Sequence, residues 1–225
     1  MLPRDFDPVL FLASFLVIVL SLSLHEFAHA KFADLAGDPT PRIQGRVTLN
    51  PLKHLDPFGT LALLLSSLSG VGFGWGRPVQ VDPRKMRNPK WDHFTSVLAG
   101  PVSNLVLAII FAAIMRFTQF GTSFSGMLGG GAEIVPAILF MGVVINIGLF
   151  AFNLIPLGPL DGHWLVGAFL PDRARDRWYH WNRTTGSIVL LVLIFMPAFT
   201  GFSVIGRVLR PVAEALFALL TGIRI

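Results

Sequence analysis

The hydrophobic positions of this 225-residue chain gather into long runs that are separated by shorter polar stretches. They do not form the narrow apolar stripe that the helices of a soluble protein usually show. Several runs approach the roughly 20 residues that a helix needs to cross the hydrocarbon core of a bilayer. The clear candidates are residues 8–24, 94–117, 134–155 and 187–204, and a weaker one is 58–73. The pattern predicts an all-α polytopic membrane protein.

Composition agrees with a membrane protein. The chain is 53% hydrophobic and 14% charged, with a mean hydropathy of +0.65, which differs from the profile of a soluble domain. It has no cysteine, so disulfides and thiolate metal sites are excluded. A net charge of +5 could suggest a nucleic-acid partner, but basic residues in the loops between spans explain it better. We therefore expect a lipid bilayer around the chain and no nucleic acid.

We expect a single domain over residues 1–225, with five to six membrane segments. Its parts are a first helix at 8–33, a loop at 34–93 that contains a re-entrant segment at 58–73, core spans at 94–117 and 134–162, and C-terminal segments at 187–225.

Two regions leave finer detail open. Short strand-like stretches at 44–49 and 77–81 predict a small β element between the first and third apolar segments. The last piece, 206–225, has basic ends around an apolar middle. It fits either a helix on the membrane surface or a last short span.

Three ionisable side chains stand at the end of the first apolar run, in the sequence His25-Glu26-Phe27-Ala28-His29. On a helix, positions i and i+4 share one face, so both imidazoles can bind one zinc ion. Glu26 then lies beside the metal, where it can take a proton from bound water. The chain has only three glutamates, and burying one within a membrane helix without partners would cost several kcal/mol. The motif therefore indicates a zinc site.

A catalytic zinc ion usually has three protein ligands and one open position, so a third ligand must come from another segment. Residues 153–162 read NLIPLGPLDG, and the prolines must break the helix there. Non-helical backbone at membrane depth is tolerated only around a protein-lined or watered cavity. Asp161 at the end of this break is the preferred third ligand, and His163 is its rival. Asn153 either donates a hydrogen bond to a developing oxyanion or ties two helices together.

These segments resemble the site-two protease family of intramembrane zinc metalloproteases, in its compact prokaryotic form. The likeness rests on HEFAHA and NLIPLGPLDG, and extends to GRVTLNPLKHLDPFGT, GWGRPVQVDPRKMRNP and LAGPVSN between them. The resemblance implies that His25, His29 and Asp161 hold one zinc ion per chain. It further implies that Glu26 is the general base and that Asn153 positions substrate or stabilises the tetrahedral intermediate. Single-span or other membrane proteins are then the expected substrates.

The depth of these residues also predicts the topology. His25, His29 and Asp161 lie at the C-terminal ends of their apolar runs, so the two helices must run parallel to bring them together. The chain between them then crosses the membrane an odd number of times, which favours a re-entrant 58–73. A spanning 58–73 would also place basic loops on opposite faces, against the positive-inside rule.

The N-terminus is then outside, and the site lies towards the cytoplasm in a prokaryotic cell membrane. Glu26 precedes Lys31 by five residues, or about 7 Å of helix. Gly100-Pro101 either kinks its span or lets another helix approach, and Asn104 is either an interhelical hydrogen-bonding residue or a site residue.

The alternative function is a non-proteolytic protein that binds or transports zinc with the same ligands. Transport needs a polar path on both sides of the site, yet Ser14 is the one polar residue between Val9 and Leu20. The sequence therefore favours the protease.

Overall fold

The computed structural model describes residues 7–68, 74–118 and 133–223, and in this part of the chain the structure is helical. The longer helices in chain order are α1 (Pro8–Leu35), α3 (Pro57–Leu68), α4 (Trp91–Phe117), α6 (Ile134–Asn153), α7 (Asp161–Ala168), α8 (Asp172–Trp181), α9 (Ser187–Thr200) and α10 (Val204–Thr221). Short pieces are α2 (Thr40–Ile43), the 3₁₀ turns η1 (Pro51–Lys53) and η2 (Pro83–Lys85), and the π-turn η4 (Asn182–Gly186), which joins α8 to α9.

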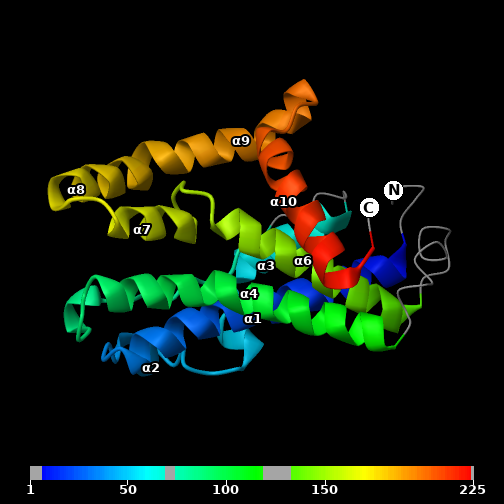
Figure 1. Cartoon of the computed structure of the whole chain (residues 1–225), viewed down its shortest axis with the longest axis horizontal. Coiled ribbons are helices and arrows are strands. Elements are labelled where there is room, and N and C mark those ends of the chain that lie inside the picture. Colours follow the sequence, from blue (N-terminus) through cyan, green and yellow to red (C-terminus); the bar gives the residue numbers. More distant parts are fainter. Residues whose placement is uncertain (1–6, 69–73, 119–132, 224–225) are drawn as a thin grey trace.

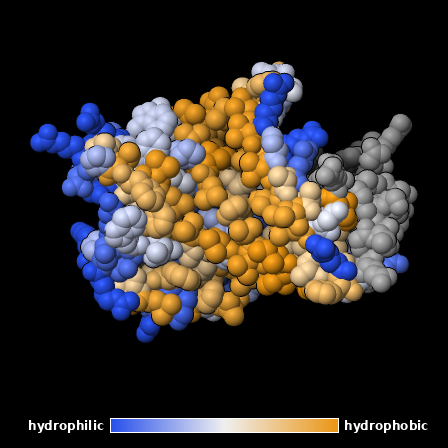
Figure 2. Space-filling view, viewed as in Figure 1, coloured by the Kyte–Doolittle hydropathy of each residue, from blue (hydrophilic) through white to orange (hydrophobic). Residues whose placement is uncertain are grey.

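Four helices are long and apolar enough to cross a membrane: α1, α4, α6 and the continuous helix Asp172–Thr200. Figure 2 shows a broad apolar band over the middle of one face, with hydrophilic residues gathered at the end where α2, α8 and the start of α4 lie. The chain is thus a multi-pass membrane protein. The predicted total of five to six segments depends on α3 and α10, which are not among these four helices, and it stays a prediction.

The helices α1, α4 and α6 pack side by side as the centre of the molecule (Figure 1). Small residues let them approach closely: Ala13 packs against Ala137, and Ala108 and Ala112 share a cluster with Phe217 of α10. Large apolar side chains point outwards instead, including Leu12, Leu16 and Leu20 of α1 and Val106, Ile109 and Ile110 of α4. Small residues inside and large ones outside are typical of helices that pack within lipid.

The direction of the three central helices follows from their contacts. Ala13 and Ala137 lie near the beginnings of α1 and α6, so these helices run parallel. Along α4 the order reverses, because Asn104 contacts His25 whereas the earlier Ser96 contacts His29. The parallel arrangement that the sequence requires of the two motif-bearing helices is present.

The loop between α1 and α4 is held together by side chains rather than by a sheet. Asp38 is fully buried, and its two carboxylate oxygens accept from the amides of Thr40 and Asp82, at 3.0 and 2.7 Å. Nearby, the amide of Gln44 donates to the side-chain oxygen of Gln80 at 2.8 Å. Residues 38–44 and 80–82 therefore lie at the same end of the molecule.

The predicted β element is reduced, within the described residues, to an isolated antiparallel bridge between Leu55 and Gly76. Side chains form hydrogen bonds with the backbone groups that would otherwise pair with a second strand. The amide of Val79 donates to Glu26, and the carbonyl of Arg77 accepts from Arg46. The stretch 44–49 forms turns and bends rather than a strand.

The predicted re-entrant segment 58–73 falls on α3 and on residues 69–73, which lie outside the described part. A helix of 12 residues is about 18 Å long, well short of the roughly 30 Å of a bilayer core. The Leu55–Gly76 bridge brings the two flanks of this segment together. These features are those that a re-entrant segment needs, and the re-entry itself remains a prediction.

Candidate metal centre

Two histidines of α1 and one aspartate of α7 converge on one point. The Nε2 atoms of His25 and His29 are 2.9 Å apart, and the Oδ2 of Asp161 lies 3.2 and 3.4 Å from them. Within the described part of the chain, His25, His29 and Asp161 form a group of side chains that could hold a metal ion. The two histidines that the helix spacing suggested and the aspartate that the proline-broken segment suggested thus lie close together.

Partners on the far side of each imidazole fix its tautomer. The Nδ1 of His29 lies 2.8 Å from the backbone carbonyl of Ser96, which can only accept a hydrogen bond. The Nδ1 of His25 lies 2.7 Å from the carboxamide oxygen of Asn104, also an acceptor. Both Nδ1 atoms therefore carry the proton, and both Nε2 atoms present a lone pair, as they do in metal-binding histidines.

This convergence of lone pairs suits a cation. The buried Oδ2 of Asp161 receives no hydrogen bond, and the two Nε2 atoms have no proton to give it. Three acceptors this close repel one another unless a positive ion lies between them. Ligand atoms of a tetrahedral zinc site, with bonds of about 2.0–2.1 Å, are separated by roughly 3.3 Å. The donor set and its spacing therefore fit zinc, with a fourth position left over.

Gly100 of α4 makes room for both imidazoles. A Cβ atom at this position would lie 2.3 Å from the ring of His29 and 2.8 Å from that of His25. A side chain there would displace one ring or both. Of the two roles open for Gly100-Pro101, the structure supports the close approach of another helix.

A buried asparagine, Asn182, holds the segment that precedes the third candidate ligand, Asp161. The helix α6 ends at Asn153, and the chain turns through Pro156 and Pro159 before α7 begins at Asp161. Within this turn the amide of Gly158 donates to the Oδ1 of Asn182 at 2.7 Å, and Asn182 is fully buried. Asn182 opens the π-turn η4, a feature that is frequent at functional sites. It thereby anchors the segment that delivers Asp161.

The carboxylate of Glu26 is held by a loop. Its Oε2 accepts a hydrogen bond from the amide of Val79 at 3.0 Å, and Gly76 lies beside its side chain. The buried guanidinium of Arg46 donates to the backbone carbonyls of Lys53 and Arg77. Burial lowers the pKa of Arg46, and the negative charge of Glu26 acts in the opposite direction. Arg46 thus fixes the loop over Glu26 and contributes positive charge near it.

The two remaining candidates, Asn153 and His163, do not belong to the converging group of His25, His29 and Asp161. The amide of Asn153 donates to the carbonyl of Leu149 in its own helix, at 2.9 Å. The Nδ1 of His163 is engaged with the carbonyl of Leu160, and His163 is not among the converging ligands. The geometry therefore favours Asp161 over His163 and leaves the role of Asn153 as a prediction.

Four residues that support the site were not predicted as supports from the sequence: Ser96, Asn146, Asn182 and Arg46. Asn146 completes a buried chain, since its side-chain oxygen accepts from Asn104 at 3.0 Å. A polar residue in the middle of an apolar helix is the signal that could have identified Asn146, because such residues are costly and usually have partners. The roles of Ser96 and Arg46 rest on backbone carbonyls from distant segments, which no sequence pattern marks.

Comparison of the sequence with known proteins shows the family to which the chain belongs. Residues 13–197 match the model of "Peptidase family M50". The chain is 38% identical over 183 residues to "Putative zinc metalloprotease YwhC" of Bacillus subtilis, covering 81% of this chain and 80% of the relative. It is 32% identical over 200 residues to "Putative zinc metalloprotease Rip2" of Mycolicibacterium smegmatis, covering 85% and 71% respectively. No solved structure matches the chain.

Proposed function

Because the chain belongs to peptidase family M50, we propose that it is an intramembrane zinc endopeptidase with one zinc ion per chain. Its substrates are membrane proteins, cut at peptide bonds within or near their transmembrane segments. The observation that carries the proposal is the convergence of His25, His29 and Asp161, with Glu26 next to His25 on the same helix. Zinc bound there would supply the Lewis acidity that makes a water molecule acidic near neutral pH.

Each residue around the ion has a role in the hydrolysis. Glu26 accepts a proton from the attacking water and passes it to the nitrogen of the leaving amine. Its bond to Val79 uses Oε2 and leaves the other carboxylate oxygen to take that proton. Asn153 stabilises the oxyanion, because its amide has a second hydrogen besides the one donated to Leu149.

The side of the membrane follows from charge. The loop that carries Arg42, Arg46, Arg77, Arg84 and Lys85 lies between α1 and α4. The contact between Gln44 and Gln80 brings the two halves of this loop together. Under the positive-inside rule this end faces the cytoplasm of a prokaryotic cell. The N-terminus then lies outside, and the zinc site opens towards the cytoplasmic side.

A substrate-trapping experiment tests the activity. The chain and its Glu26→Gln variant are each co-expressed with a tagged library of single-span membrane proteins, and the library is compared by mass spectrometry. We expect a subset of the library to accumulate uncut only with Glu26→Gln. Identical libraries in the two cases would contradict the proposed proteolysis.

A further inference from the structure

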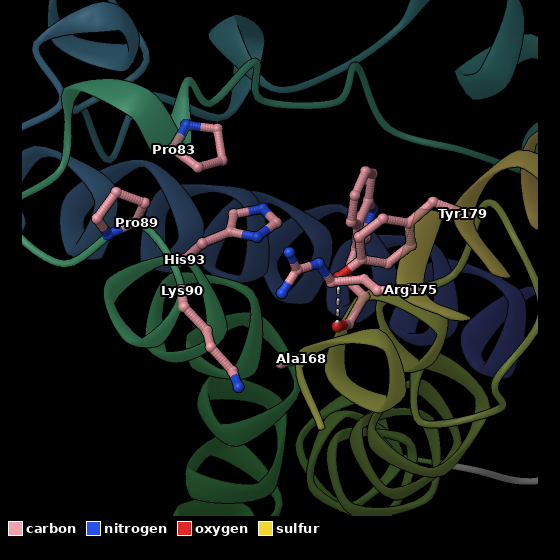
Figure 3. Close-up of a pocket in the computed structure, with 8 residues that line it drawn as sticks. Pro83, Pro89, Lys90, His93, Ala168, Arg175 and Tyr179 are labelled. Carbon is pink, nitrogen blue, oxygen red and sulfur yellow. Dashed lines mark hydrogen bonds between the residues drawn. The ribbon is translucent and has the colours of Figure 1, made fainter. Parts of the chain in front are cut away.

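A cavity lined by basic, aromatic and small apolar residues lies near the metal centre, between the start of α4, the helix α7 and the start of α8. It has a volume of about 230 Å³. Lys90 and His93 line it from the side of α4, and Arg175 and Tyr179 line it from α8. Figure 3 shows the guanidinium of Arg175 extending across the cavity towards the imidazole of His93. Trp164 of α7 forms part of the wall.

The lining is positively charged. None of the described residues that line the cavity is acidic. Arg175 is 27% exposed, and its partner Asp172, at 2.7 Å, is 85% exposed. An ion pair with so exposed a carboxylate is weak and easily exchanged. An arginine in the cavity whose carboxylate partner is so exposed predicts an anionic ligand. Lys90 also lines the cavity, but its ammonium lies over the ring of Trp91, 5.0 Å from the ring centre. A guanidinium fork matches the geometry of phosphate oxygens especially well.

The position of the cavity at the beginning of two membrane-span candidates also suits phospholipid headgroups. Two membrane-span candidates, Trp91–Phe117 and Asp172–Thr200, both begin beside it. Trp91 stands at the first position of α4, Trp164 lines the wall, and Trp178 donates to the carbonyl of His163 at 2.8 Å. Tryptophan and tyrosine collect at the interface between lipid and water. Basic pockets between membrane helices at that depth suit anionic headgroups.

We propose that this cavity binds the phosphate group of an anionic phospholipid, with Arg175 as its cationic contact and His93 as a hydrogen-bond donor. This site lies outside the proteolytic centre, and its occupation does not depend on the proposed activity. The cavity nevertheless shares the helices α4 and α7 with the metal centre. The wall residue Trp164 follows Asp161 by one turn of α7, and His93 precedes Ser96 by one turn of α4. A bound headgroup would hold α7 against α4 and so steady the metal centre.

Thermal unfolding of the purified full-length chain in detergent tests the proposal. The titrants are phosphatidylglycerol, phosphatidylcholine and inorganic phosphate, at constant ionic strength. We expect a saturable rise in Tm with phosphatidylglycerol alone. Arg175→Gln should raise the half-saturating concentration about fivefold, the usual effect of one basic side chain near an anionic surface. Arg173→Gln is the matched control, because Arg173 is exposed on the same helix and does not line the cavity.

If Arg175→Gln does not fold, Arg175→Lys gives the same test, because it keeps the positive charge but loses the guanidinium fork, and it should also raise the half-saturating concentration. Equal effects of Arg173→Gln and Arg175→Gln would overturn the proposal in favour of general surface charge. An equal rise with phosphatidylcholine would do so as well. Saturation by inorganic phosphate at the same concentration would mean that the ligand is soluble phosphate and not lipid.

Discussion

The Nδ1 of His25 lies 2.7 Å from the side-chain oxygen of Asn104, whose amide in turn donates to Asn146 at 3.0 Å. This buried chain orients the imidazole and keeps its Nε2 free of a proton. Outer partners of metal-binding histidines typically contribute 10–100-fold to metal affinity. We therefore expect Asn104→Leu to weaken zinc binding by about that factor, as measured by competition with a chromophoric chelator.

Asn104→Asp is the comparison for this prediction, because a carboxylate oxygen still accepts from His25 although the donor to Asn146 is lost. It should retain zinc better than Asn104→Leu. Equal zinc affinity of wild type and Asn104→Leu would mean that the Asn104 contact does not set the orientation of His25.

Gly100 provides a second test of the site's packing. Gly100→Ala places a Cβ atom 2.3 Å from the ring of His29, so we expect zinc content and activity to fall together. Gly148→Ala is the control on α6, where an added Cβ meets nothing within 4 Å. It should keep its zinc and, given the helix propensity of alanine, gain up to about 1 kcal/mol in stability. Loss of zinc in both variants, or in neither, would contradict the close packing of Gly100 against the two imidazoles.

The contact between Asn182 and Gly158 predicts that a residue 21 positions beyond Asp161 affects metal binding. Asn182→Ala leaves the buried amide of Gly158 without its acceptor, which costs about 1–3 kcal/mol. We expect a lower Tm and weaker zinc retention during dialysis. Thr184→Ala, in the same π-turn, removes an exposed hydroxyl that bonds only within its own helix, and it should behave as wild type. A normal Tm for Asn182→Ala would refute this role.

Topology is tested by cysteines introduced into this cysteine-free chain. Gln44 and Gln80 are joined by a hydrogen bond of 2.8 Å, so Gln44→Cys and Gln80→Cys should react with a membrane-impermeant maleimide from the same face. That face should be the cytoplasm, with labelling only after cell lysis. Glu133→Cys, at the opposite end of α4 and α6, should label in intact cells. Labelling of Gln44→Cys and Gln80→Cys from opposite faces would mean that segment 58–73 spans the membrane.

The sequence was most informative where chemistry is local. The i, i+4 spacing places His25 and His29 on one face of any helix, and Pro156 and Pro159 must end α6 before Asp161. It was less informative where distant segments meet. Nothing in the sequence near Gly100 reveals that two imidazoles pack against it. The expected β element failed to form among the described residues for a similar reason, because Glu26 and Arg46 take up backbone groups of the 77–81 segment.

The most direct test of the account compares zinc content and cleavage in purified Glu26→Gln and Asp161→Asn. Glu26→Gln removes the base but no metal ligand, so zinc should stay at about one ion per chain while cleavage of a trapped substrate falls by roughly 10² to 10⁴. Asp161→Asn replaces a ligand by a poor one, so zinc and activity should fall together. Cleavage by Glu26→Gln at a rate near that of wild type would contradict the proposed mechanism.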